Sequence, residues 1–198
     1  MVNITHLLLA AGGSNRMGTP KQLLPWGNIT LIEHQINTLL ETGHNVVVVL
    51  GAYANDILPI IKKLPVTICI NNNWENGMGA SIAFGTEMIS NKFHDASGVL
   101  ISLIDQPLVT TLHFQKMISS FQPLKKMIIV SQSSSGWKGA PVLFEAGYLE
   151  VLKTLKLDEG AKKIMQQESE NIQSVNADNL LTDIDTPESY QKMIQTLF

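Results

Sequence analysis

The chain has 198 residues, of which 44% are hydrophobic and 16% charged, and this composition predicts one folded domain spanning residues 1–198. A net charge of −3 and a pI near 5.9 argue against a nucleic-acid-binding surface, because such surfaces concentrate Lys and Arg. Cys69 is the single cysteine, which excludes an intramolecular disulfide, and with no signal-peptide pattern and no run of about 18 apolar residues we expect a cytoplasmic protein without a membrane partner.

The first predicted strand, around Leu7 to Leu9, ends abruptly at small residues. Open α/β sheets bind ligands at the carboxyl ends of their strands, so the following loop is a candidate site. Gly12 and Gly13 allow backbone N–H groups to approach a bound group closely, and Arg16 and Lys21 add positive charge. We interpret this stretch as a phosphate-binding loop.

Two familiar nucleotide-binding patterns do not fit this loop. A Walker A loop requires Gly-x-x-x-x-Gly-Lys-Ser/Thr, and although Gly13 and Gly18 have the spacing, Thr19 stands where the lysine belongs. No Gly-x-Gly-x-x-Gly follows the strand, so the dinucleotide fingerprint is missing as well. A glycine-rich turn with two solvated cations remains an alternative interpretation of this stretch.

The next four segments alternate between helix and strand. Ile29 to Leu40 places apolar residues at helical spacing and precedes a glycine, whereas Val46 to Leu50 is a β-branched run typical of a strand buried on both faces. Ala54 to Lys63 is predicted as a short helix and Val66 to Ile70 as a third strand. This alternation favours a parallel sheet whose strands are connected by helices.

A polar turn with several small residues precedes the next predicted helix, which runs to about Ile89. Gly77, Gly79 and Ser81 would let a ligand approach the start of this helix, where unpaired N–H groups create positive potential. An ordinary glycine-containing turn explains the same residues equally well, so both interpretations stay open for this stretch.

Gly98 to Ile104 is a regular strand pattern that leads directly into Asp105. A carboxylate at the end of a buried parallel strand would lie at the ligand-binding edge, and Mg²⁺ shared with substrate phosphates prefers such oxygen ligands. We therefore expect Asp105 to bind Mg²⁺. The alternative is a simple turn aspartate before Pro107.

The second half of the chain continues the alternation, with a helix over Leu112 to Phe121 and strands over Met127 to Val130 and Ile172 to Val175. Ser131 to Gly136 is serine-rich and is interpreted as a mobile loop. Thr186 is expected to cap the last helix, whose first position is a proline. With six or seven strands, the sequence predicts an α/β fold, a three-layer α/β/α sandwich with a mainly parallel sheet.

Several motifs resemble the molybdenum-cofactor nucleotidyltransferases, whose fold is a Rossmann-like α/β/α sandwich of the nucleotide-diphospho-sugar transferase type. The opening loop matches Leu-Ala-Ala-Gly, Arg-Met-Gly and Lys in order, and the later turn matches Asn-x-x-Trp followed by Gly-Met-Gly-x-Ser. The other motifs are Asp-x-Pro, Gly-x-Pro-x-Leu-Phe and Asp-Ile-Asp-Thr-Pro. The motifs lie in family order at 7–21, 73–81, 105–108, 139–144 and 183–187.

Two stretches depart from the family pattern. Ala140 stands where histidine or asparagine is common, and Leu157 to Lys162 matches a Gly-Asp-x-Gly-Ala-Arg element only in part. These departures concern how this side of the site holds its substrate.

The resemblance implies an enzyme that transfers CMP from CTP to the terminal phosphate of molybdopterin or molybdenum cofactor, releases pyrophosphate and serves an apo molybdenum hydroxylase. Its catalytic residues would be Arg16 on the β and γ phosphates, Lys21 on the α-phosphate and Asp105, which with Asp185 would bind the Mg²⁺ cofactor. The nucleotide-binding set that the resemblance implies is Leu9, Ala10, Ala11, Gly12, Gly13, Arg16, Lys21, Gly77, Gly79 and Ser81.

Other functions remain as alternatives. Ala11 and Met78 would occupy volume that a purine needs, which favours CTP, but a GTP-dependent guanylyltransferase acting on the same cofactor also fits the motifs. Another cytidylyl or sugar-nucleotide transferase fits as well, and Asp183 with Asp185 forms the Asp-x-Asp of nucleotide-sugar glycosyltransferases. A noncatalytic accessory that delivers the cofactor is the last alternative, although a pure carrier would not need the charged residues of the site.

Overall fold

The centre of the computed structural model, which describes residues 2–157 and 160–198, is a seven-stranded sheet with the order β5-β4-β1-β6-β8-β7-β9. β8 is antiparallel to its neighbours β6 and β7, and the other neighbouring strands are parallel to each other. The strands are β1 (Ile4–Ala10), β4 (Asn45–Leu50), β5 (Thr67–Ile70), β6 (Gly98–Leu103), β7 (Ile128–Ser133), β8 (Lys138–Glu145) and β9 (Ile172–Asp178).

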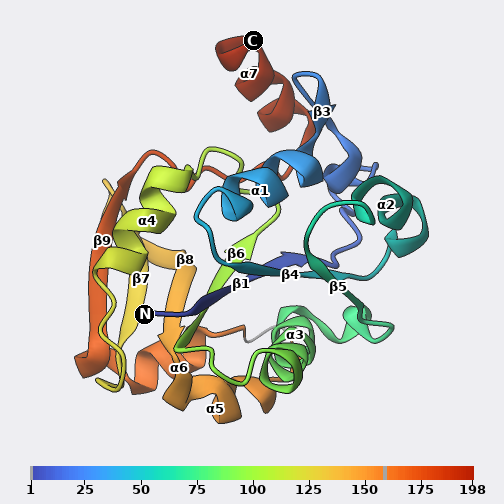
Figure 1. The fold of residues 1–198 in the computed structure, drawn as a ribbon. Coiled ribbons are helices and arrows are strands. Elements are labelled where there is room, and N and C mark those ends of the chain that lie inside the picture. Colours follow the sequence, from blue (N-terminus) through green and yellow to red (C-terminus); the bar gives the residue numbers. More distant parts are fainter. Residues whose placement is uncertain (1, 158–159) are drawn as a thin grey trace.

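Helices cover both faces of this sheet (Figure 1). One face carries α1 (Leu31–Leu40), α2 (Ala54–Ile61) and α4 (Thr111–Ser119), and the other carries α3 (Met78–Lys92), α5 (Leu149–Lys153) and α6 (Lys162–Gln167). The short 3₁₀ helices are η1 (Lys21–Leu23), η2 (Trp74–Asn76), η3 (Ala146–Tyr148) and η5 (Ser169–Asn171). The predicted α/β/α sandwich with a mostly parallel sheet is confirmed.

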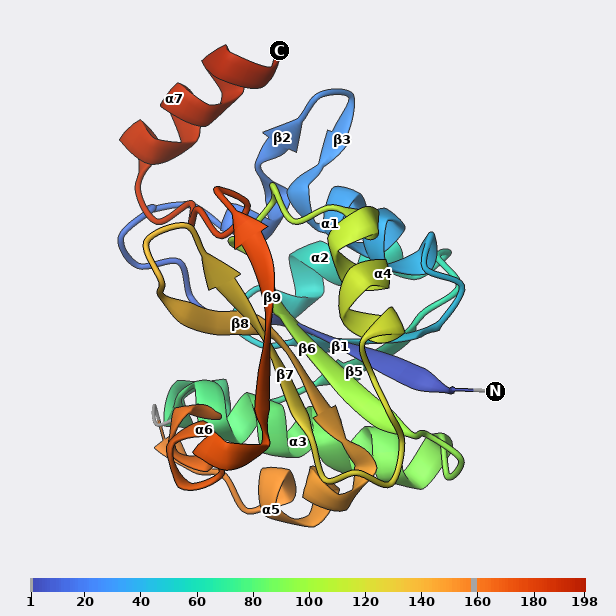
Figure 2. The same ribbon diagram turned by 90° about the vertical axis from the view of Figure 1, so that its left-hand side faces the viewer.

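The C-terminal helix α7 (Pro187–Leu197) projects away from the sheet beside a small hairpin, β2 (Pro25–Trp26) and β3 (Ile29–Thr30) (Figure 2). The Tyr190 hydroxyl donates a hydrogen bond to the Pro25 carbonyl at 2.6 Å, which joins the helix to the hairpin. Among the described helices, none is long and apolar enough to cross a membrane.

Alternating side chains of the central strands form two hydrophobic cores. Leu8 of β1 and Val48 of β4 pack in the core on the α1 side, whereas Leu7 and Val49 pack in the core on the α3 side. A strand covered by helices on both faces has no polar face, which explains the unbroken apolar runs in the sequence.

The structure places the first predicted helix slightly later than the sequence suggested. Ile29 and Thr30 form β3, and α1 begins at Leu31. Thr30 is the N-cap of a capping box with Glu33, so the side chain that ends the hairpin also starts the helix. The predicted cap at Thr186 is confirmed, with Pro187 in the first turn.

The interpretation of Ser131 to Gly136 as a mobile loop is wrong for its first half. β7 continues through Ser133, and Ser131 is fully buried. The Ser131 hydroxyl donates a hydrogen bond to the Pro141 carbonyl at 2.8 Å and contacts His113 Nε2 at 2.8 Å. These contacts satisfy the polar side chain inside the core, so a serine-rich composition did not indicate a loop there.

The partly matching element from Leu157 to Lys162 is described only at its ends. Asp158 and Glu159 lie outside the described residues. Of the rest, Leu157 is largely exposed and α6 begins at Lys162.

Gly85 of α3 packs closely against Leu7 of β1 and Val49 of β4. A Cβ atom there would overlap Leu7 Cδ1 and lie 2.8 Å from Val49 Cγ2, and both neighbours are fully buried. We therefore expect Gly85→Val to lower the free energy of unfolding, measured by denaturant titration, by at least about 1–3 kcal/mol.

Asn91→Val places the same side chain on an exposed position of the same helix and should change this free energy by no more than about 0.5 kcal/mol. Equal effects of the two substitutions would contradict the packing account of Gly85.

Candidate functional site

A cavity of about 490 Å³ lies where β1 and β6 end. Its walls come from four parts of the sequence, within 9–22, 74–81 and 103–105 and at 185, that meet at the carboxyl edge of the sheet. The predicted site residues that line it are Leu9, Ala11, Gly12, Arg16, Lys21, Gly77, Ser81, Asp105 and Asp185.

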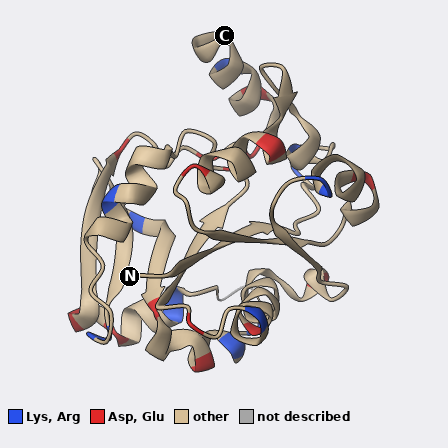
Figure 3. Ribbon diagram, viewed as in Figure 1, with Lys and Arg blue, Asp and Glu red and all other residues tan. Residues whose placement is uncertain are grey.

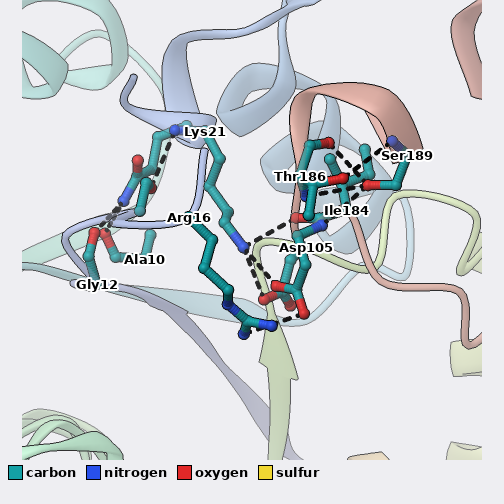
Figure 4. A network of polar contacts seen from close by, with 11 residues as sticks. Ala10, Gly12, Arg16, Lys21, Asp105, Ile184, Thr186 and Ser189 are labelled. Atoms are coloured by element: carbon teal, nitrogen blue, oxygen red, sulfur yellow. Dashed lines mark hydrogen bonds and ion pairs between the residues drawn. The ribbon is translucent and has the colours of Figure 1, made fainter. Parts of the chain in front are cut away.

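Lys21 makes the central polar contacts of this cavity (Figure 4). Its ammonium group donates hydrogen bonds to Asp105 Oδ2 at 3.1 Å, to Asp185 Oδ1 at 3.2 Å and to the Ile184 carbonyl at 2.9 Å. An ammonium group has three donors, so these three acceptors use its whole capacity. Lys21 is only 8% exposed, and a buried charge of this kind requires such partners.

Arg16 completes the charge balance of the cluster. Its guanidinium lies 3.2 Å from Asp185 Oδ2, and its side chain is 74% exposed, so this ion pair is at the surface while the contacts of Lys21 are not. The charges of Asp105 and Asp185 are therefore balanced by those of Lys21 and Arg16.

Asp105 is held in place by the chain itself, because its backbone carbonyl accepts a hydrogen bond from the Ile184 N–H at 2.8 Å. This bond ties the end of β6 to the segment before α7. The second carboxylate oxygen of Asp105, Oδ1, is buried and has no hydrogen-bond partner among the described residues. A buried carboxylate oxygen without a partner is costly, and it is free to accept a ligand.

Asp183 is a third carboxylate near this cluster. Burial and then the neighbouring Asp105 carboxylate raise its pKa above the ordinary value of an aspartate, while a hydrogen bond from Gln106 acts in the opposite direction. In the part of the chain that the structure describes, no group of three or more His, Cys, Asp or Glu residues could hold a metal ion. A cation at Asp105 and Asp185 would therefore need further oxygen ligands from water or substrate.

The glycine loop after β1 is held through its carbonyl groups. The Gln22 side-chain amide donates hydrogen bonds to Ala10 O at 2.8 Å and Gly12 O at 3.1 Å. The Ala52 N–H donates to the carbonyl of residue 11 at 3.0 Å, and the Tyr53 hydroxyl donates to Gly13 O at 2.9 Å. Four consecutive carbonyl groups are thus occupied by the protein.

The N–H groups of the same loop have no such partners. Among residues 2–157 and 160–198, the backbone N–H groups of Gly12, Gly13 and Ser14 donate no hydrogen bond. A loop whose acceptors are paired and whose donors are free is suited to an anion, which needs donors only. The loop can therefore hold phosphate oxygens without first breaking its own hydrogen bonds.

Three residues of the predicted nucleotide-binding set do not line the cavity. Ala10 is 1% exposed and belongs to the core on the α1 side. Gly13 packs against the ring of Trp74, and Gly79 packs so closely on the chain at Lys156 that a Cβ would lie 2.7 Å from its carbonyl oxygen. These three residues therefore support the loop and the start of α3 by packing against other parts of the protein.

Gln22 and Tyr53 hold the glycine loop although no sequence pattern marks them as site residues, and Trp74 stands out in the sequence only as part of the Asn-x-x-Trp motif. Gln22 directly follows Lys21 in the sequence and is only 1% exposed. The sequence signal for its burial is its place beside an apolar Leu-Leu pair. Tyr53 follows the valine strand, and its distance from Gly13 along the sequence hides their contact.

Lys and Arg are spread over several elements and interleaved with Asp and Glu in the view of Figure 3. The positive charge of the cavity therefore comes from the two residues that line it, Arg16 and Lys21, rather than from a broad basic surface.

Comparisons with known proteins place this geometry in a family context. A model of the MobA-like NTP transferase domain matches residues 6–172. A nicotine blue oxidoreductase of Paenarthrobacter nicotinovorans is 30% identical over 200 residues, which cover 96% of each chain. A molybdenum cofactor cytidylyltransferase of Escherichia coli is 23% identical and covers 96% of this chain and 95% of its own.

Solved structures share the fold of this chain. The crystal structure of Rv0371c from Mycobacterium tuberculosis superposes with a TM-score of 0.86 at 26% identity, covering 98% of both chains. A second structure of Rv0371c, described as a complex with manganese, superposes with a TM-score of 0.82 at 22% identity over 99% of this chain and 100% of that one. Because the family model spans most of the chain and a relative matches its whole length, the chain belongs to the MobA-like NTP transferase family.

Proposed function

We propose that the chain transfers a nucleoside monophosphate from a nucleoside triphosphate to a phosphate monoester and releases pyrophosphate, with CTP as donor and molybdopterin or molybdenum cofactor as acceptor. One observation carries this proposal: Lys21, Asp105 and Asp185 lie in the same cavity as the glycine loop with its free N–H groups. This combination offers donors to phosphate oxygens and acids to a divalent cation.

The names of relatives support the donor and acceptor only indirectly. The relative from Escherichia coli is a molybdenum cofactor cytidylyltransferase, which agrees with the proposed reaction. The relative from Paenarthrobacter nicotinovorans carries the name of an oxidoreductase. The present chain has no Gly-x-Gly-x-x-Gly after β1, and its buried Lys21 with two acids suits phosphate chemistry, so we favour nucleotidyl transfer.

The residues present fit a magnesium ion. Asp105 Oδ1 is buried and has no partner in the described part of the chain, and carboxylate oxygens are the ligands that Mg²⁺ prefers when it also binds substrate phosphates. The manganese complex of Rv0371c supports a divalent cation in this family. Asp105 and Asp185 would hold the ion, which would neutralise charge on the triphosphate and the leaving pyrophosphate.

The chain's own residues would act by positioning and charge stabilisation. The acceptor phosphate is already ionised and needs no protein base, so no nucleophilic side chain is required. Arg16 would bind the β and γ phosphates in the bidentate geometry that a guanidinium favours, and the N–H groups of the glycine loop would bind phosphate oxygens. Lys21 would stabilise the charge that develops at the α-phosphate.

Lys21 must change partners for this reaction. In the structure its ammonium uses all three donors on Asp105, Asp185 and the Ile184 carbonyl. It would leave the two carboxylates when a divalent cation takes its place there, and the phosphate then becomes its new acceptor. Cation and nucleotide would therefore bind cooperatively, because each removes an obstacle to the other.

A pyrophosphate-release assay tests the proposed function. The chain is incubated with Mg²⁺, each of the four nucleoside triphosphates and molybdopterin, with Asp105→Asn as the inactive control. Release that depends on both CTP and acceptor supports the proposal. Reduction or oxidation of a substrate with no pyrophosphate formed would instead support the chemistry named for the oxidoreductase relative.

Lys21 and Arg16 should differ in their kinetic effects. An interaction that strengthens in the transition state affects kcat, whereas one on the leaving pyrophosphate also contributes to ground-state binding. Steady-state kinetics should therefore show a fall in kcat of at least about a hundredfold for Lys21→Met, and a rise in the nucleotide KM for Arg16→Gln. If both variants changed KM alone, the division of roles would be wrong.

The choice of base is predicted from Ala11 and Met78, which both line the cavity. Their side chains would occupy space that a purine ring needs, and overpacking a rigid site costs about 1–3 kcal/mol or more. We expect kcat/KM for CTP to exceed that for GTP at least about tenfold, and Ala11→Gly to reduce this ratio. Equal use of CTP and GTP by the wild-type chain would rule out this basis for selectivity.

A further inference from the structure

Trp74 lies between the glycine loop and the start of α3, which both line the cavity. It is the first residue of η2, between β5 and α3, and it lines the cavity while packing against the core on the α3 side. Its carbonyl accepts a hydrogen bond from the Gly77 N–H at 3.1 Å, which connects it to the start of α3. Trp74 belongs to neither the catalytic nor the nucleotide-binding residues proposed above.

The indole of Trp74 lies between two glycines, Gly51 just after β4 and Gly13 in the loop after β1. A Cβ atom on Gly51, just after β4, would lie 2.7 Å from both Cβ and Cγ of Trp74. A Cβ atom on Gly13 would lie 3.2 Å from Cη2 and 3.3 Å from Cζ3, at the far edge of the ring. The ring therefore reaches from the end of β4 to the glycine loop and fills the space that two missing side chains leave open.

The segment after β4 also holds the glycine loop by hydrogen bonds. The Ala52 N–H donates to the carbonyl of Ala11 at 3.0 Å, and the Tyr53 hydroxyl donates to the Gly13 carbonyl at 2.9 Å. Hydrogen bonds fix the direction of the carbonyl groups, while the ring of Trp74 limits how closely the loop can approach β4. Together these contacts determine where the free N–H groups of the loop lie.

We propose that Trp74 is a positioning residue that sets the distance between the glycine loop and the start of α3, and thereby the place of the triphosphate relative to the base. This inference rests on the proposed function, because it assumes that the loop binds the triphosphate. The indole is rigid and in contact with Gly13, Gly51 and the turn before α3. It therefore keeps the glycine loop at a fixed distance from the start of α3.

The proposal predicts a specific kinetic pattern. The loop N–H groups bind the triphosphate in the ground state and in the transition state, so misplacing them mainly raises KM. Trp74→Leu should raise the nucleotide KM about tenfold with a much smaller change in kcat. Trp74→Phe keeps a flat ring but lacks the far edge that contacts Gly13, so its KM should lie between those of the wild type and Trp74→Leu.

A second substitution tests the contact itself. Gly13→Ala should raise KM in the wild-type chain, because its methyl group would lie 3.2 Å from the Trp74 ring, besides 3.1 Å from Asn15 Oδ1, which both backgrounds share. In the Trp74→Leu background the same methyl group would fill part of the space left by the ring, so Gly13→Ala should lower KM there. Such a reversal of sign reports direct coupling between the two positions.

Trp137→Leu is the matched control. Trp137 lies in the turn before β8, is 52% exposed and is not part of the cavity wall, so its loss should leave the nucleotide KM unchanged. Thermal unfolding of every variant separates loss of fold from loss of positioning. An unchanged KM in Trp74→Leu, or an effect of Gly13→Ala that is the same in both backgrounds, would overturn the proposal.

Calorimetric binding of inorganic triphosphate distinguishes this proposal from the proposed reaction. Weaker binding by Trp74→Leu, with no pyrophosphate released from any nucleotide by the wild type, would support the positioning role and contradict nucleotidyl transfer. Unaltered binding by Trp74→Leu, with normal pyrophosphate release by the wild type, would overturn the positioning role and leave the reaction standing.

Discussion

The contact of one ammonium group with two carboxylates determines the organisation of the site. Lys21 joins the N-terminal segment to Asp105 at the end of β6 and to Asp185 before α7, which are 84 and 164 residues away along the chain. Without Lys21, two carboxylates and a carbonyl would face each other in a partly buried position, which is unfavourable. The same positive charge that holds these segments together is the charge proposed to act on phosphate.

The glycine loop is preorganised by hydrogen bonds to its carbonyl groups. Gln22, the Ala52 N–H and Tyr53 hold its carbonyl groups, so the free N–H groups remain oriented without any ligand present. A preorganised site loses less free energy on binding than one that must order itself. In contrast, the acids of the site are paired with internal cations, so the proposed metal ion would bind only with an exchange of partners.

Local patterns in the sequence predicted the elements and the position of Asp105 well, because buried strands and helix caps follow short-range rules. The valine run of β4 and the cap at Thr186 are examples. The serine-rich stretch failed because Ser131 finds its partners in α4 and β8, far along the chain. The contacts of Tyr53 and Trp74 with Gly13 were missed for the same reason, because both residues lie far from the glycine loop along the sequence.

The exchange of Lys21 for a divalent cation is tested most directly by the affinity for Mn²⁺ without nucleotide, measured by electron paramagnetic resonance. Lys21→Met should bind Mn²⁺ at least about tenfold more tightly than the wild type, because both carboxylates lose the ammonium group that they share, while Asp185 keeps its exposed ion pair with Arg16. Arg16→Gln removes one charge from the exposed side of Asp185 and should have a smaller effect. Equal or weaker Mn²⁺ binding by Lys21→Met would contradict the account.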